Sequence, residues 1–139
     1  MANKLYFNVS DKLVIDGNDG LSVDLTVDWN DVELASPLSV DTKGKVHPFV
    51  TGETFIGILS NKLIKNTDMD VAGVNVIEAS YLKGGYYFWV RAKGTVALGD
   101  PLTADVKGFK KATDDDKIVG YAVSKGADGE AIRIRGGNY

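Results

Sequence analysis

Alternation of apolar and polar residues is the feature of this 139-residue sequence that most limits its fold. In "LSVDLTVDW" (21–29) apolar side chains occupy every second position, and "AIRIR" (131–135) alternates in the same way. Because side chains along a β-strand point to opposite faces in turn, this pattern predicts half-buried strands. Turn residues recur every ~8–12 positions, as in sandwiches and barrels. Further strands are expected at 54–60, 71–82, 86–92 and 117–124, a hairpin turn at 16–20 and a helical turn or two only at 60–66.

A near-repeat divides the chain. "PLSVDTKG" (37–44) and "PLTADVKG" (101–108) share Pro, Leu, Asp, Lys and Gly at the same places. With a gap shorter by one residue in the second copy, Gly57 and Gly120 also align inside short apolar segments. A central glycine in a strand indicates a bulge or a close backbone approach. We therefore expect an all-β fold, a compact barrel or sandwich of short antiparallel strands, built from two related β units at 35–60 and 99–124.

Composition and charge exclude several classes of protein. Hydrophobic residues make up 44% and charged residues 25%, which is ordinary for a globular chain and predicts a single domain over 1–139. The net charge of −3 argues against direct nucleic-acid binding, which needs a basic surface. All three arginines lie in the second half of the chain. Cysteine is absent, so no disulfide or thiolate site is expected. Neither a signal peptide nor an apolar run of about 20 residues is found, so no membrane partner is expected.

No constellation of catalytic residues is evident. The single histidine, His47, follows "KV" and precedes proline, and we expect it at a turn or on the surface rather than in a metal site. The acidic run 114–116 and the "DGNDG" segment at 16–20 lack the spacing of a calcium loop and predict solvated turns. Only Glu78 lies in an apolar segment, and an outward-facing strand position explains it equally well. We therefore predict no enzyme, no cofactor and no metal. A small hydrolase using paired Asp and Glu is the least favoured alternative.

Two segments are candidate contact surfaces. One face of the strand at 86–92 carries Tyr87, Trp89 and Arg91, residue types enriched at binding hot spots. The alternative is that both faces of this strand are buried, as in a two-layer sandwich. The N-terminal residues 1–9 are apolar at several positions and predict an extended arm that pairs with its own sheet or with a neighbour. The candidate contacts for a shell or a subunit are Leu5, Tyr6, Phe7, Tyr87, Trp89 and Arg91.

Residues 94–135 resemble the C-terminal half of the small capsid cement, or decoration, proteins of tailed bacteriophages. The matching elements are turn and strand-start residues. The first copy resembles this pattern more loosely, because Ala35-Ser36 stands where the second has Gly99-Asp100. The elements in the second copy are Gly99-Asp100-Pro101-Leu102, Asp105 with Gly108, Lys110 to Ala112, Ile118 to Ala122, Gly126 to Gly129 and Ala131 to Arg135.

The resemblance implies a non-enzymatic β protein on the outer surface of a capsid. Its partners would be the major capsid protein and further copies of itself, with a trimer favoured, and it would brace the shell after synthesis in the host cytoplasm. A carbohydrate-binding or adhesive β module, displayed on a virion or elsewhere, is the alternative. In that case Tyr87 and Trp89 would stack on sugar rings.

Overall fold

The structure is a computed structural model that describes residues 12–15, 22–24, 26–63, 76–80, 82 and 84–137. These residues form eleven strands and one short 3₁₀ helix, η2 (Trp29–Asp31), which confirms the all-β prediction. The strands are β1 (Lys12–Ile15), β2 (Ser22–Val23), β3 (Pro37–Val40), β4 (Lys45–Pro48), β5 (Thr54–Leu63), β6 (Val76–Ser80), β7 (Tyr87–Arg91), β8 (Pro101–Asp105), β9 (Gly108–Lys111), β10 (Gly120–Ala122) and β11 (Ala131–Gly136).

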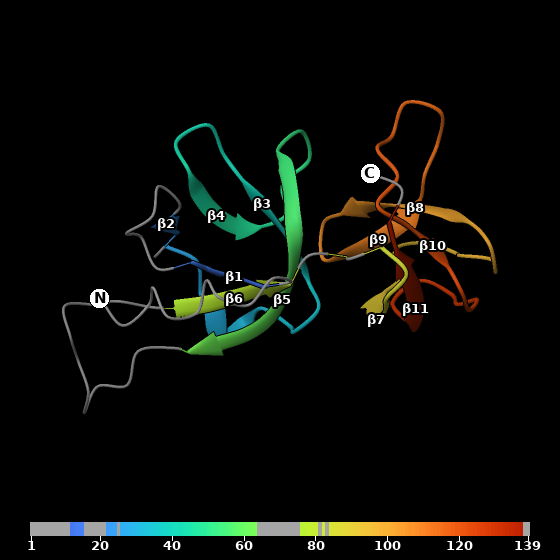
Figure 1. Ribbon diagram of the computed structural model, residues 1–139, viewed down its shortest axis with the longest axis horizontal. Coiled ribbons are helices and arrows are strands. Elements are labelled where there is room, and N and C mark those ends of the chain that lie inside the picture. The colour runs from blue at the N-terminus through green and yellow to red at the C-terminus, as the bar shows by residue number, and fades with distance from the viewer. Residues whose placement is uncertain are drawn as a thin grey trace.

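The strands form two sheets that lie side by side (Figure 1). The first has the order β1-β6-β5-β3-β4-β2 and the second has the order β7-β11-β10-β8-β9. Neighbouring strands are antiparallel except for β2 and β4, which are parallel. The sheets are open and do not close into a barrel, although a single bridge joins Ala92, directly after β7, to Phe109 in β9.

The second sheet repeats five of the six strands of the first, and β2 has no counterpart in it. In chain order β1, β3, β4, β5 and β6 correspond to β7 to β11, and each corresponding pair has the same neighbours. The registers agree as well. Leu38 lies opposite Gly57, and Leu102 lies opposite Gly120. The alignment of the two glycines is therefore confirmed, and the two related units extend beyond the ranges predicted from the sequence.

The loop that enters β3 has the same backbone as the loop that enters β8. The N–H of Ala35 donates to the carbonyl of Leu59 at 2.7 Å, and the N–H of Gly99 donates to the carbonyl of Ala122 at 2.8 Å. Both donors have positive φ, 70° at Ala35 and 88° at Gly99. The first unit thus keeps a left-handed backbone where its sequence lacks the glycine that this conformation favours.

Exchanging the residue types at these two positions should change stability in opposite directions. Ala35→Gly is expected to raise the free energy of unfolding by about 0.5 kcal/mol, since a left-handed conformation costs an L-residue roughly 1–2 kcal/mol and glycine's unfolded-state entropy offsets part of that gain. Gly99→Ala is expected to lower the free energy of unfolding by about 1 kcal/mol, because alanine is strained at this positive φ. The loss should be no larger, since no atom lies within 4 Å of the new Cβ to clash with it. Urea denaturation of both variants measures this, and a change of the same sign at both positions would contradict it.

Each sheet has its own hydrophobic core. The first core contains Trp29, Leu38, Val46 and Leu59, all at most 2% exposed. The second core is larger, and the side chain of Ile58 in β5 of the first sheet belongs to it. The ring of Phe55, also in β5, packs edge-on against Phe109 with centroids 6.0 Å apart. Strand β5 therefore packs the two sheets together. The members of the second core are Ile58, Leu82, Val90, Ala92, Val96, Leu102, Ala104, Phe109, Val119, Ala122, Ile132 and Ile134.

Two local predictions are wrong. Among residues 22–24 and 26–29, which the structure describes in the alternating segment 21–29, only β2 is a strand, and the last apolar residue, Trp29, begins η2. The Trp29 side chain is buried there, and its Nε1–H donates to the carbonyl of Asp24 at 2.9 Å. Packing into the first core has overridden the period of two. The expected helical turn at 60–66 is also wrong as far as residue 63, because β5 continues to Leu63. The predicted hairpin turn at 16–20 lies outside the described residues.

Candidate functional site

The outer face of β7 is exposed, as one of the two sequence interpretations predicted. Tyr87 is 53% exposed and Trp89 is 60% exposed, whereas Val90 on the opposite face is 2% exposed. Phe88 packs against the second core. The alternative in which both faces of this strand are buried is therefore wrong. Leu5, Tyr6 and Phe7, the other candidate contacts, lie outside the described residues.

Strand β11 places two arginines beside these aromatic side chains. Arg133 lies directly opposite Trp89, and Arg135 lies directly opposite Tyr87. The guanidinium carbon of Arg133 is 5.2 Å from the centre of the Tyr87 ring and 5.5 Å from that of Trp89, within cation–π range. With Arg91, the three arginines of the chain share one sheet face. We call Tyr87, Trp89, Arg91, Arg133 and Arg135 the arginine–aromatic face.

The sequence contained only part of the signal for this face. The alternation in 131–135 predicts Arg133 and Arg135 on one side of a strand, and both are exposed. The pairing of β7 with β11 joins them to Trp89 across about 40 intervening residues, and no pattern in the sequence reports that pairing. Tyr121 in β10 lies opposite Arg135 and extends the face by one further strand.

Arg91 differs from the other two arginines because it links the two halves of the molecule. Its Nε and Nη2 donate to the two carboxylate oxygens of Glu33 at 2.9 and 3.0 Å, and its Nη1 donates to the carbonyl of Gly129 at 3.3 Å. This pair holds the pKa of Glu33 below its ordinary value. Arg91 therefore joins β7 to the segment that precedes β3.

The Arg91–Glu33 pair predicts a small dependence of stability on pH. Because the pKa of Glu33 is lower in the folded protein, its contribution is present above the ordinary value of 4.5 and is lost as pH falls through the folded value. Both side chains are about half exposed, so we expect Glu33→Gln to cost less than about 1 kcal/mol at neutral pH. Urea denaturation of wild type and variant over this range measures the difference. A difference that persists undiminished in strong acid would contradict the prediction.

A shallow hollow borders Trp89 where the two sheets meet. Leu34 in this hollow is 51% exposed, so an apolar residue of the first unit is open to solvent beside the aromatic residues of the second. The hollow is lined by Glu33, Leu34, Ala35, Trp89, Val90, Arg91 and Ala131.

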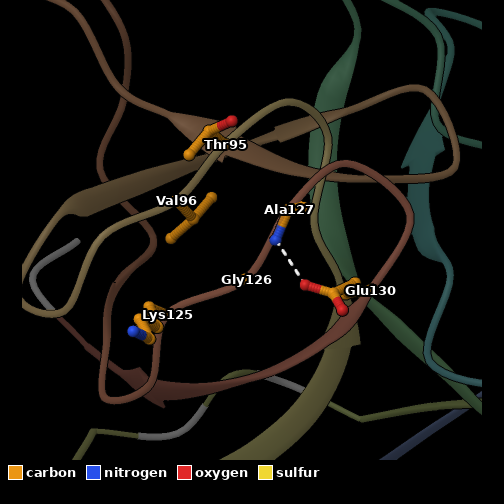
Figure 2. A pocket seen from close by; sticks show the side chains of 6 residues that line it. All are labelled: Thr95, Val96, Lys125, Gly126, Ala127 and Glu130. Carbon is orange, nitrogen blue, oxygen red and sulfur yellow. Dashed lines mark hydrogen bonds between the residues drawn. The ribbon is translucent and has the colours of Figure 1, made fainter.

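A second hollow lies among the loops of the second unit (Figure 2). Its acidic side chain, Glu130, accepts a hydrogen bond from the backbone N–H of Ala127 at 2.6 Å. This contact shapes the turn before β11. Lys125 is the other ionisable residue that lines the hollow, and no aromatic residue lines it. The arginine–aromatic face is therefore the better candidate for binding a partner.

His47 lies in β4, so its predicted position at a turn or on the surface is wrong. Its side chain is only 14% exposed. Nδ1 is 3.3 Å from Oδ2 of Asp24, and Nε2 is 2.5 Å from Oε1 of Glu53. Partial burial alone would lower the pKa of His47, but its hydrogen bonds with these carboxylates, and their charges, outweigh that effect and raise it. The parallel pairing of β2 with β4 brings Asp24 to the ring.

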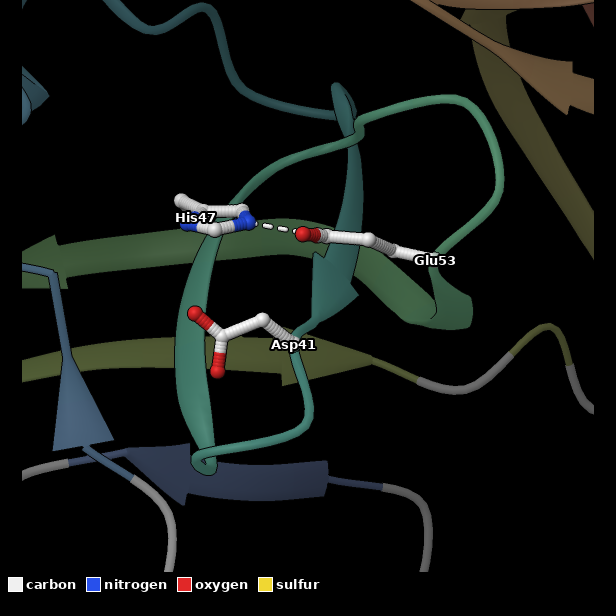
Figure 3. A group of neighbouring side chains, drawn as sticks. All are labelled: Asp41, His47 and Glu53. Carbon is white, nitrogen blue, oxygen red and sulfur yellow. Dashed lines mark hydrogen bonds and ion pairs between the residues drawn. The ribbon is translucent and has the colours of Figure 1, made fainter.

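Asp41 completes this group of side chains (Figure 3). Asp41, His47 and Glu53 each offer one ligand atom, and these atoms all lie within 4.8 Å of one another. Among the described residues this is the cluster whose side chains have the composition and spacing to hold a metal ion. The sequence indicated it only through a lone histidine between two acids, a pattern that is common by chance.

No protein-family model matches this sequence, and no curated protein matches it. The likeness to phage cement proteins therefore stays a prediction. Over the described ranges, no helix has the length and apolar character needed to cross a membrane.

Proposed function

We propose that this protein is a structural component of a tailed-phage virion that binds the outer surface of the capsid and stabilises the shell. The observation that carries the proposal is the arginine–aromatic face. Trp, Tyr and Arg are the residue types that dominate binding energy at protein interfaces. Here Tyr87, Trp89 and Arg133 are exposed on a paired sheet above a packed core, so little ordering is needed on binding.

The charges of the face favour an acidic or carbonyl-rich protein surface as its partner. Neither Arg133 nor Arg135 forms an ion pair with a carboxylate of the described residues, so their guanidinium groups remain available to a partner. Contact with the capsid would bury the Trp89 ring and pair these groups with capsid carboxylates or backbone carbonyls. Shell stabilisation follows if one copy, or an oligomer of copies, spans neighbouring capsid subunits.

A carbohydrate-binding module is the second candidate, because Trp89 borders a hollow that includes Leu34 and Ala35. A sugar ring would need the open face of an aromatic side chain. Arg133 lies over the rings of both Tyr87 and Trp89, which reduces the ring surface that is available for stacking. Contact with a protein is therefore the better match to the observed arrangement. Trp89-dependent binding on a glycan array would reverse this preference.

Sedimentation with purified capsids of the encoding phage tests the proposal. We expect the protein to sediment with capsids and Trp89→Ala to weaken binding about thirtyfold, which corresponds to a hot-spot loss of about 2 kcal/mol. Leu98→Ala is the matched control, since Leu98 is 72% exposed on a loop of the same sheet and lies outside the arginine–aromatic face. Absence of capsid binding, or equal binding by the Trp89 variant, would contradict the proposal.

The same assay tests the predicted arm and oligomer. Deletion of residues 1–9 should lower capsid occupancy if the arm contacts the shell, and unchanged occupancy would exclude that role. Sedimentation velocity of the free protein measures its self-association, for which a trimer is the expected result.

A further inference from the structure

We propose that Asp41, His47 and Glu53 bind a divalent transition-metal cation, and that Zn²⁺ is the ion that fits them best. The three residues come from three adjoining parts of the first unit: the end of β3, the middle of β4 and the loop before β5. Their ligand atoms lie within 4.8 Å of one another, and their side chains converge in Figure 3. This site is separate from the arginine–aromatic face and does not depend on the proposed function.

Asp41 is anchored through one oxygen, which leaves the other for a ligand. Its Oδ1 accepts hydrogen bonds from the backbone N–H groups of Lys43 at 2.8 Å and Lys45 at 3.0 Å. These bonds orient the carboxylate within the β3–β4 turn. The second oxygen takes no part in them and is free to coordinate an ion.

His47 and Glu53 are also oriented by hydrogen bonds with neighbouring side chains. Oδ2 of Asp24 accepts a hydrogen bond from Nδ1–H of His47. This bond selects the tautomer that presents Nε2 as a ligand, and it matches the carboxylate–histidine arrangement of many metal sites. Ser39, which is fully buried, donates its hydroxyl to Oε1 of Glu53 at 2.8 Å and accepts from the N–H of Val50 at 3.0 Å. Each of the three ligands thus has an outer partner that fixes its direction.

The donor set selects the class of ion. One imidazole nitrogen and two carboxylates suit zinc, which binds three protein ligands and a water in open tetrahedral sites. Two negative charges balance a divalent cation. An ion with bonds of about 2 Å to Nε2 and Oε1 would space those atoms at roughly 3.3 Å. Binding therefore replaces the hydrogen bond between His47 and Glu53 and needs only a small movement of the two side chains.

The second unit provides an internal comparison. Lys110 lies opposite Thr103 as His47 lies opposite Ser39, so lysine occupies the equivalent place. An ammonium group has no lone pair with which to coordinate a metal. Asp116, which aligns with Glu53 in the repeat, instead accepts hydrogen bonds from Thr113. Metal binding would thus be confined to the first unit, where the ion would tie the β3–β4 hairpin to the start of β5.

Titration of metal-free, untagged protein with Zn²⁺ tests the proposal, by calorimetry and by NMR of the imidazole nitrogens. The chain has one histidine, so the NMR signal is unambiguous. We expect one ion per chain and a large shift at Nε2, with the Nδ1 proton retained. Asp41→Asn should weaken binding at least tenfold, and Asp24→Asn should weaken it by about 10–100-fold, as for other outer partners of a ligand. Asp116→Asn is the matched control and should bind Zn²⁺ as the wild type does.

The variants are chosen so that misfolding does not obscure the result. Asp41→Asn keeps an oxygen that can accept from Lys43 and Lys45, so the turn is retained and only the ligand is weakened. His47→Gln should abolish the site, so Zn²⁺ should raise the melting temperature of the wild type and of Asp116→Asn but not that of His47→Gln. Unchanged imidazole signals at millimolar Zn²⁺, or binding that survives Asp41→Asn undiminished, would overturn the proposal.

Discussion

Replacing Phe109 with alanine should lower the free energy of unfolding by about 4 kcal/mol, the size expected for a buried phenylalanine. Phe109 is fully buried and is the largest side chain in the second core. Its ring also packs edge-on against Phe55 of the first sheet. The substitution therefore removes apolar contacts within one core and between the two sheets. Urea denaturation followed by circular dichroism measures the loss.

The equivalent position in the first unit supplies the control. Val46 lies opposite Val40 as Phe109 lies opposite Ala104, and Val46 is also fully buried. Val46→Ala removes two methyl groups and should cost about 2 kcal/mol, roughly half as much as the loss of the phenyl ring. Equal losses at the two positions, or a loss below about 1 kcal/mol for Phe109→Ala, would show that the second core can close around the cavity.

Gly120→Ala should cost about 3 kcal/mol, because the added methyl group has no room. A Cβ at Gly120 would lie 2.5 Å from the carbonyl oxygen of Arg135 and 2.8 Å from Cγ1 of Ile134. The first contact is with backbone in the paired strand β11, so side-chain rotation cannot relieve it. Thermal or urea denaturation should show the loss as an earlier transition.

Gly84→Ala tests the same change of residue without the clash. Its new Cβ would have only the Cα of Gly137 nearby, at 4.0 Å, and its backbone does not require a positive φ. We expect stability to be unchanged or raised by up to about 1 kcal/mol through the lower entropy of the unfolded chain. Comparable destabilisation by both variants would mean that loss of glycine flexibility, and not crowding at Gly120, is responsible.

The sequence predicted the fold class and much of the strand pattern because these depend on local rules. Alternation in 86–92 correctly placed Tyr87 and Trp89 on the face opposite Val90, since strand side chains alternate whatever the strand pairs with. The repeat correctly aligned Gly57 with Gly120. Alternation was misleading at Trp29, where an indole buried in the core and hydrogen-bonded to Asp24 ends the strand pattern early.

The two copies of the repeated motif differ in a way that only the hairpin geometry decides. The equivalent pairs Val40–Val46 and Ala104–Phe109 enclose five residues in the first copy and four in the second. In the first copy Gly44 lies in the turn with a φ of 80°. In the second copy Gly108 has moved into β9, where a Cβ would lie 2.7 Å from the carbonyl oxygen of Arg91. Gly44 is needed for its backbone conformation and Gly108 for its lack of a side chain, although the residues around the two glycines are nearly identical.

By itself the sequence determined that the chain forms short, two-faced strands and that it contains a duplicated β unit. It also determined which side chains of the strands at 86–92 and 131–135 point outward. Tertiary structure decided which strands become neighbours. The arginine–aromatic face depends on the pairing of β7 with β11, and the contact of Asp24 with His47 depends on the pairing of β2 with β4. Strand pairing is set by contacts between residues that are far apart in the chain. Local periodicity determines the faces of a strand and carries no information about its partner.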